Sequence, residues 1–248
     1  MSRFSSLPVF VLALAACSNA APTPTPGLCD QRVALANTPQ WTDACANAQV
    51  DWADARCLDT AWQLPACGTL TELDGADFGG QHIPLPTPIT YTDDPPMSGP
   101  HRAEWPFWGE YAFLPKQRWI HGLEHGAVTI LYNPCVPESL VETLRTWAQS
   151  VPPDDAGAFR WLLTPYPGLD SAFSLVTWRH RLKGNCFDAA AAEQFRQAHY
   201  RHAAEDVPYD GTYACVWLGR SCGIATGSGD ADAVDGTTMG GLVSRDGQ

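Results

Sequence analysis

The chain has 248 residues, of which 45% are hydrophobic and ten are tryptophan, which is enough apolar material for a packed core of domain size. Its formal net charge is −12, from 27 acidic residues against 15 lysines and arginines, and the sequence contains no basic stripe. Such a surface would repel a phosphate backbone, so nucleic acid is excluded as an expected partner.

The first sixteen residues have the pattern of an export signal. Arg3 and the amino terminus supply positive charge, and residues 7–16 form an apolar run too short to span a bilayer. The run ends in Leu14-Ala-Ala-Cys17, which resembles the bacterial lipobox, in which the cysteine becomes the acylated first residue of a lipoprotein. An ordinary signal peptide, cleaved after a small residue, is the alternative. We expect a lipid anchor at Cys17 that holds the chain on a membrane of the bacterial cell envelope, facing the periplasm or the cell surface.

Composition divides the rest of the chain into four segments. Residues 17–28 are rich in proline and threonine and predict a semi-rigid tether. Residues 29–75 are rich in cysteine and tryptophan and predict a small helical head stapled by disulfides. We place the main domain at residues 76–224 and expect the aperiodic residues 225–248 to be disordered.

Nine cysteines are many for this length, and eight of them follow Cys17. An even number of cysteines in an exported chain predicts disulfide bonds. No two have the spacing of a zinc ribbon, so thiolate metal binding is not expected. Proximity favours pairing of the first four within the head and of Cys215 with Cys222, which leaves Cys135 with Cys186. Other connectivities stay open, because spacing alone does not choose among them.

The main domain begins with extended sequence. Residues 83–92 alternate proline with apolar side chains and predict an extended segment, with an edge strand as one form of it. The β-branched run at residues 127–132 predicts a central strand. Pro137 is expected to open a helix that ends before Pro152-Pro153. One face of this helix carries Leu140, Leu144 and Trp147.

Two strands are predicted next, at residues 159–163 and 173–178, with a turn at 164–168 between them. Asp188 is expected to cap an alanine-rich helix that runs to about Ala204. Its buried face would include Ala191, Phe195 and Ala198. The order strand, helix, strand, strand, helix favours an α+β fold, a compact sandwich with helices over one face of a small mixed sheet.

Four of the seven histidines fall between residues 82 and 125. His82 and His101 lie in proline-rich segments, and His121 and His125 lie in His121-Gly-Leu-Glu-His-Gly126. Rigid approaches of this kind would hold the imidazoles in place before an ion binds. We therefore predict that His82, His101, His121 and His125 bind one metal ion.

The identity of the ion follows from the donor types. Imidazoles without thiolates suit zinc or copper, and Met97, four residues before His101, would shift the choice slightly towards copper. We expect Glu124 to orient an imidazole through a hydrogen bond rather than to bind the ion. A role in metal binding or homeostasis is favoured over catalysis.

Two other interpretations remain open. His121-Gly-Leu-Glu-His125 also fits the H-x-x-E-H motif of inverted zinc peptidases, in which the glutamate activates water for hydrolysis. That chemistry needs a helix, whereas Gly122 and Gly126 indicate a turn leading into a strand. In the other interpretation the histidines fix buried turns, and the protein is a structural or interaction module with the head as its contact surface.

Other histidines and tryptophans have simpler explanations. His199 and His202 lie one helical turn apart, which is more typical of packing than of metal binding, and His180 is expected at an exposed strand end. Three tryptophans, Trp105, Trp108 and Trp119, bracket the segment between His101 and His121. Core filling is expected there rather than an aromatic wall around a ligand.

Several motifs follow one another along roughly half of the chain. They are His82-Ile-Pro, Tyr91 with Pro95-Pro-x-Ser-Gly-Pro-His101, Gly109-Glu-Tyr111, His121-Gly-Leu-Glu-His-Gly-Ala-Val128, Tyr132, and Pro165-Tyr-Pro-Gly-Leu169 with Trp178. From His82 to about Pro208 the chain thereby resembles a bacterial family known as domain-of-unknown-function family 3105. Met97 departs from the pattern, because the family more usually has a small hydroxyl residue there. The resemblance implies an exported, often membrane-anchored domain, and it implies no established activity.

Overall fold

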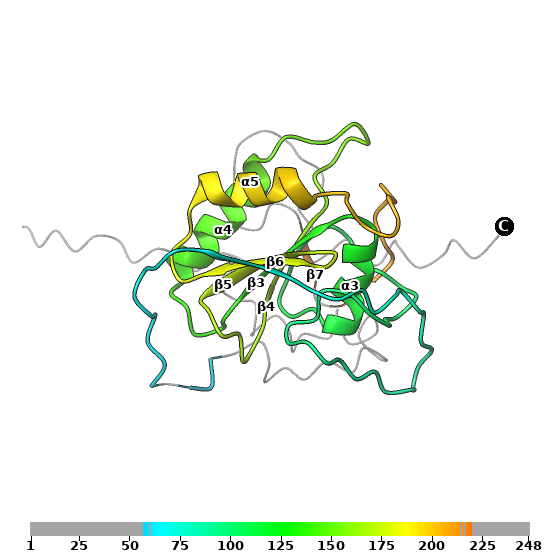
Figure 1. The fold of residues 1–248 in the computed structure, drawn as a ribbon, viewed down its shortest axis with the longest axis horizontal. Coiled ribbons are helices and arrows are strands. Elements are labelled where there is room, and N and C mark those ends of the chain that lie inside the picture. The colour runs from blue at the N-terminus through cyan, green and yellow to red at the C-terminus, as the bar shows by residue number, and fades with distance from the viewer. Residues whose placement is uncertain (1–56, 60, 214, 216, 220–248) are drawn as a thin grey trace, which may run out of the picture.

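The computed structural model describes residues 57–59, 61–213, 215 and 217–219. These residues form one seven-stranded mixed sheet with the strand order β1-β6-β5-β3-β4-β2-β7, together with three α-helices (Figure 1). The strands are β1 (Thr71–Asp74), β2 (Gly109–Tyr111), β3 (Val128–Tyr132), β4 (Trp161–Pro165), β5 (Phe173–Thr177), β6 (His180–Gly184) and β7 (Trp217–Gly219). The helices are α3 (Lys116–Glu124), α4 (Glu138–Ser150) and α5 (Ala189–His199). The predicted α+β class is confirmed.

Strand β3 is the predicted central strand. It pairs in parallel with β4 and antiparallel with β5, and all of its residues are buried. Strand β2 continues the parallel part beside β4, whereas β6, β1 and β7 join antiparallel. A strand that is covered on both faces reads as a continuous apolar run, as β3 does.

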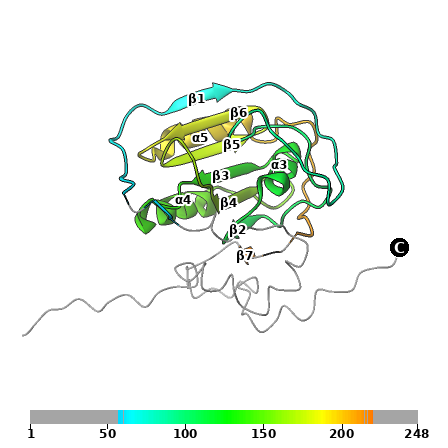
Figure 2. The ribbon, with the colours of Figure 1, turned by 90° about the horizontal axis from the view of Figure 1, so that it is seen from below.

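Helices cover both faces of the sheet (Figures 1 and 2). Along β3, Val128 and Ile130 belong to the hydrophobic core with α4 and α5, whereas Leu131 belongs to the core with α3. The expectation that helices cover one face only was therefore wrong. Its cause is α3, a helix that the sequence pattern did not reveal.

The two predicted helices are present. Helix α4 follows Pro137 and ends at Ser150, with Leu144 and Trp147 buried. The carboxylate of Asp188 caps α5 by accepting hydrogen bonds from the backbone N–H groups of Ala190 and Ala191 at 2.9 and 3.3 Å.

Helix α5 ends at His199 rather than near Ala204, because Tyr200 is extended and Arg201 has a positive φ of 65°. Its buried residues are Ala192 and Phe195, whereas Ala198, predicted to face the core, is exposed. The prediction held for Phe195 and failed for the helix end.

Residues 83–92, predicted to be extended with an edge strand as one form, do not form a strand. All of these residues are described, and they form turns and irregular backbone. The Arg102 guanidinium donates to the carbonyls of Ile83, Pro84 and Thr87 at 2.9–3.0 Å. Carbonyls that a strand would offer to a neighbouring strand are thus bonded to one side chain. Farther along, β4 begins two residues later than predicted, and β6 was not foreseen.

Two disulfides contradict the preferred pairing. Cys57 is bonded to Cys135, and Cys67 is bonded to Cys186. Strand β1, which follows Cys67, pairs with β6 at the edge of the sheet, and both described cysteines before it are bonded to cysteines of the predicted main domain. Cys215 is also disulfide-bonded, and its predicted partner Cys222 lies outside the described residues.

The predicted signal peptide, the tether with Cys17, residues 29–56 of the head and the tail from residue 225 also lie outside the described residues. Among the helices that are described, none combines the length and the apolar character needed to cross a membrane.

Candidate metal centre

The His121–His125 segment is helical, which corrects the expectation of a turn. Helix α3 extends to Glu124 and is closed by His125. Gly126, with φ of +86°, donates its N–H to the carbonyl of Leu123 at 2.9 Å, and Ala127 donates to that of Gly122 at 3.0 Å. This pair of bonds is a Schellman motif, in which glycine takes the left-handed position after the helix. The turn into β3 therefore exists, but it follows the motif.

Gly122 lies inside α3 for a packing reason. A Cβ at this position would lie 2.9 Å from Leu162 Cδ1 on β4 and 3.4 Å from Trp108 Cζ3. The glycine lets the helix lie close against the sheet. Because tertiary packing contributes most of the stability of short helices, this contact outweighs the low helix propensity of glycine.

His82 and His101 are brought together by a short parallel pairing of two loops. The N–H of His101 donates to the Gln81 carbonyl at 2.9 Å, and the N–H of Ile83 donates to the His101 carbonyl at 2.8 Å. Directly opposed residues of paired segments project to the same side, so the two imidazoles are neighbours. The Arg102 bonds to the following carbonyls hold the His82 loop against this pairing.

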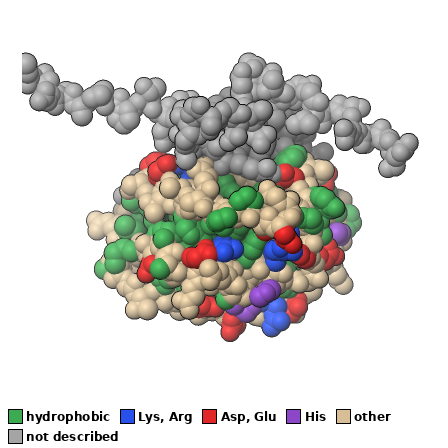
Figure 3. Space-filling model, turned by 90° about the horizontal axis from the view of Figure 1, so that it is seen from above, with side chains coloured by type: hydrophobic (Ala, Val, Ile, Leu, Met, Phe, Trp, Pro, Cys, Tyr) green, Lys and Arg blue, Asp and Glu red, His purple; other side chains and the backbone are tan. Residues whose placement is uncertain are grey.

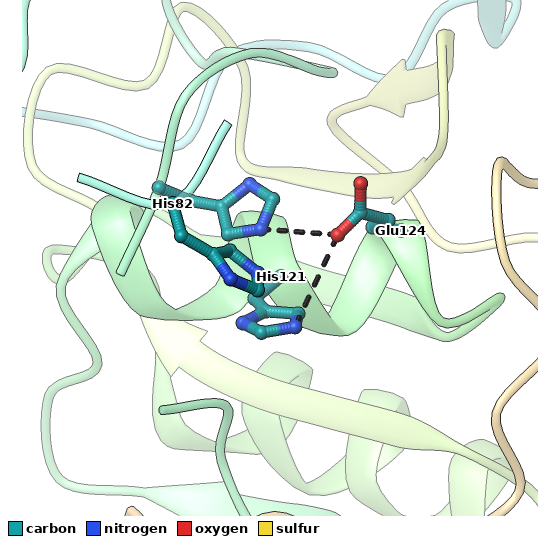
Figure 4. A group of neighbouring side chains, drawn as sticks. His82, His121 and Glu124 are labelled. Carbon is teal, nitrogen blue, oxygen red and sulfur yellow. Dashed lines mark ion pairs between the residues drawn. The ribbon is translucent and has the colours of Figure 1, made fainter. Parts of the chain in front are cut away.

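Three imidazoles and one carboxylate converge between these loops and α3. The ring centroids of His82, His101 and His121 lie 4.5–5.1 Å apart. One donor atom from each ring and one oxygen of Glu124 all lie within 4.8 Å of one another. Figure 4 shows His82, His121 and Glu124 directed towards one another, the latter two from the same helix. These side chains can hold a metal ion, and Glu124 lies among the donors rather than behind them.

Hydrogen bonds to backbone carbonyls orient the two buried imidazoles. His101 Nδ1 lies 2.9 Å from the Gly99 carbonyl oxygen, and His121 Nδ1 lies 2.8 Å from that of Arg102. A carbonyl oxygen only accepts, so each Nδ1 is the protonated donor, and in a neutral ring Nε2 keeps its lone pair. A backbone acceptor on the nitrogen away from the ion is typical of metal-binding histidines.

Another acceptor lies close to His101 Nε2. Glu124 Oε2 lies 3.1 Å from His101 Nε2 and 3.9 Å from His121 Nε2. The contact lacks hydrogen-bond geometry, and among the described residues His101 Nε2 has no hydrogen-bond partner, although the side chain is fully buried. Two acceptors at this distance in a buried site repel each other unless a proton or a metal cation lies between them.

Burial also keeps the helix histidines neutral. It lowers the pKa of His121 to about 3 and that of His125 to about 4. The neighbouring histidines lower both values further, whereas the Arg102 carbonyl opposes the shift at His121 and the Glu124 carboxylate opposes it at His125. The nitrogen lone pairs are therefore not lost to protons near neutral pH.

His125, the fourth predicted ligand, adjoins the group from the end of α3. Its Nε2 lies 3.1 Å from His121 Nε2 and 3.3 Å from Glu205 Oε2. The backbone N–H of Glu205 donates to the Glu124 carbonyl at 2.9 Å, which places this carboxylate at the edge of the centre. His125, Glu124 and Glu205 form a second set of donors that shares Glu124 with the first. The four predicted histidines thus lie together, and their role as ligands stays a prediction.

Of the three tryptophans and Met97, only Trp105 lies at the site, and the others are in the core. Trp108 and Trp119 are buried in the core with α3, as expected. Trp105 instead borders the site, with ring centroids 5.1 Å from His121 and 4.6 Å from His125. Met97 packs in the α3 core with its thioether beside Gly75, so the argument that it favours copper loses its support.

The family described as "Protein of unknown function (DUF3105)" matches residues 82–218. The match spans more than half of the 248 residues, and the chain belongs to this family. The matched region begins at His82 and contains every side chain of the centre. No curated protein and no solved structure matches the chain.

Proposed function

We propose that this family member is a lipoprotein of the bacterial cell envelope that binds a transition metal ion, zinc or copper, in a binding or homeostasis role. His82, His101, His121 and Glu124 are the ligands, with His125 beside them. The observation that carries the proposal is the buried contact of 3.1 Å between His101 Nε2 and Glu124 Oε2. Both atoms are acceptors, and a cation bound between them would replace their mutual repulsion with attraction to the ion.

The distances between donors support this proposal. Ligand atoms about 2.0–2.2 Å from a tetrahedral zinc ion lie roughly 3–4 Å from one another. The separations of 3.1 and 3.9 Å from Glu124 Oε2 to the two buried imidazoles fall in this range. Three imidazoles with one carboxylate suit zinc, and copper in second place now that Met97 packs in the core.

Metal analysis of the full-length protein, purified without a histidine tag, tests the proposal. After dialysis against a weak chelator that strips exposed sites, we expect about one zinc or copper ion per chain to remain at the buried centre. A protein that is isolated without metal and takes up neither added ion would contradict the proposal.

A zinc hydrolase is the second candidate, favoured by the helical conformation of His121-Gly-Leu-Glu-His125. His121, Glu124 and His125 share one side of α3, and the two Nε2 atoms lie 3.1 Å apart, as in a pair of zinc ligands. In this alternative Glu124 activates water instead of binding the ion. The contact of Glu124 with His101 favours the ligand role.

We propose further that Cys17 carries the lipid anchor that places the centre at a membrane. The support is the sequence Leu14-Ala-Ala-Cys17 and the proline-rich tether after it. Stable anchoring needs more than one acyl chain, which a lipoprotein amino terminus provides. Cys17→Ala should therefore leave the protein soluble or as an uncleaved precursor in fractionated cells. A cleaved Cys17→Ala protein that stays on the membrane like the wild type would rule out this anchor.

A further inference from the structure

A second histidine pair lies away from the metal centre, where β1, β6 and α5 meet. His180 begins β6 and His199 ends α5, and their rings stack with centroids 3.9 Å apart and planes inclined by 21°. His202, three residues after His199, is exposed. Its Nδ1 donates to the Ala198 carbonyl at 2.7 Å. The partner of His199 therefore comes from a neighbouring strand.

Two carboxylates of the edge strand β1 hold this pair. Glu72 Oε1 lies 2.7 Å from His199 Nε2, and Asp74 Oδ1 lies 2.7 Å from His180 Nδ1. Glu72 and Asp74 are two positions apart on a strand, so both side chains project to the same face. Figure 3 shows histidine side chains at the surface on the side of the molecule that carries α5, with acidic side chains nearby.

We propose that Glu72, His180 and His199 form a second site, for zinc, that is separate from the centre at α3. One donor atom from each of the three side chains lies within 4.8 Å of the other two. Two imidazoles and a carboxylate are ordinary zinc ligands, and a water molecule from solvent can complete a tetrahedral shell. The side chains of Glu72, His180 and His199 are 49%, 28% and 14% exposed, so an ion can reach them.

Asp74 and the end of α5 prepare the site for a cation. Because Asp74 accepts from Nδ1 of His180, Nε2 is the nitrogen left to bind zinc, as in carboxylate–histidine–zinc arrangements. His199 lies in the last turn of α5, where the helix dipole favours positive charge. Zinc that replaces the proton between His199 Nε2 and Glu72 Oε1 would move these two atoms from 2.7 Å to roughly 3–4 Å apart, a shift that the 49% exposed Glu72 side chain allows.

The location gives this ion a structural role. Every residue of β1 is exposed, so the strand is held by its ladder with β6 and by the nearby disulfide between Cys67 and Cys186. Zinc bound by Glu72, His180 and His199 would add a link from β1 to β6 and to α5. It would stabilise the folded chain through its preferential binding to that state.

Equilibrium dialysis of the full-length protein against zinc tests the inference. The double variant His180→Gln with His199→Gln should bind about one zinc ion per chain fewer than the wild type, and the matched control His202→Gln should bind as many as the wild type. The variant His101→Gln with His121→Gln should keep the ion at the β1 site, so failure at one centre is distinguishable from failure at the other. Equal zinc uptake by the wild type and the His180→Gln/His199→Gln variant would overturn the inference.

Milder substitutions keep the test valid if the double variant does not fold. Asp74 is 80% exposed, and Asp74→Asn should weaken zinc binding at this site by about 10–100-fold while leaving the centre at α3 unchanged. Glu72→Gln removes one ligand from the edge strand and should have a larger effect on the same ion. Unchanged zinc affinity in both variants would also overturn the inference.

Discussion

The double variant His101→Gln with His121→Gln should lose metal binding at the α3 centre, with an affinity at least about 100-fold below that of the wild type. Glutamine is close to histidine in size, and its amide can still donate to the Gly99 and Arg102 carbonyls, but it is a poor ligand for zinc or copper. Competition with a chelating dye measures the affinity. An unchanged affinity in a folded double variant would refute the assignment of these two ligands.

Glu124→Gln then separates the two candidate functions. If Glu124 binds the ion, the affinity falls together with that of the histidine variants. If it acts as a base in a hydrolase, the ion stays bound, because the base is not a ligand. Gly80→Ala provides an independent check, since its Cβ would overlap Glu124 Oε1 and push the carboxylate aside without removing a donor. Gly68→Ala, whose Cβ would meet nothing within 4 Å, is the matched control.

The sequence predicted the centre of the fold better than its periphery. Strand β3 and helix α4 carry long, unambiguous patterns, and both were found within a few residues of their predicted bounds. The short strands β1 and β2 have only four and three residues, which is too few for a periodicity to appear. The disulfide partners depended on β1, because its pairing with β6 brings the chain that follows Cys67 onto the sheet, and Cys57 and Cys67 are bonded to Cys135 and Cys186 of the predicted main domain.

Helix α3 shows why local propensity can mislead at a site. The two glycines of its motif pointed to a turn, but one of them permits close packing on Leu162 and the other ends the helix. A glycine directly after the motif is also a helix-end signal, and it was the available clue. The clustering of the four histidines was nevertheless predicted, because it rested on their spacing in rigid loops rather than on the secondary structure.

Other contacts of the two histidine sites were beyond sequence reasoning. The contact between His180 and His199 and the approach of Glu205 to His125 both join segments far apart in the chain. Neither histidine of the surface pair stands in a motif, so only the packing of α5 against the sheet reveals them. The place of Glu124 among the candidate ligands likewise depends on the room that Gly80 leaves in a neighbouring loop.

Glu110→Ala should cost the fold about 3–5 kcal/mol, the largest loss of stability expected from a single substitution here. Glu110 lies in β2 and is fully buried, and it binds the buried Arg145 of α4 through two hydrogen bonds of 2.6 and 3.0 Å. Removing the carboxylate leaves a guanidinium in the core without its buried partner. Denaturant unfolding of the variant and the wild type measures the difference.

Glu142→Ala is the matched control for this substitution. Glu142 also contacts Arg145, but its side chain is 52% exposed, so water screens the pair and the expected loss is about 0–1 kcal/mol. Similar losses of stability in the two variants would show that the buried pair of Glu110 with Arg145 stabilises the fold no more than the exposed pair of Glu142 with Arg145. Glu110 belongs to the motif Gly109-Glu-Tyr111 and is not among the side chains grouped as donors at the centre, so the folded Glu110→Ala protein should bind metal as the wild type does. That result would distinguish a motif residue that stabilises the fold, Glu110, from the motif residues that bind the ion.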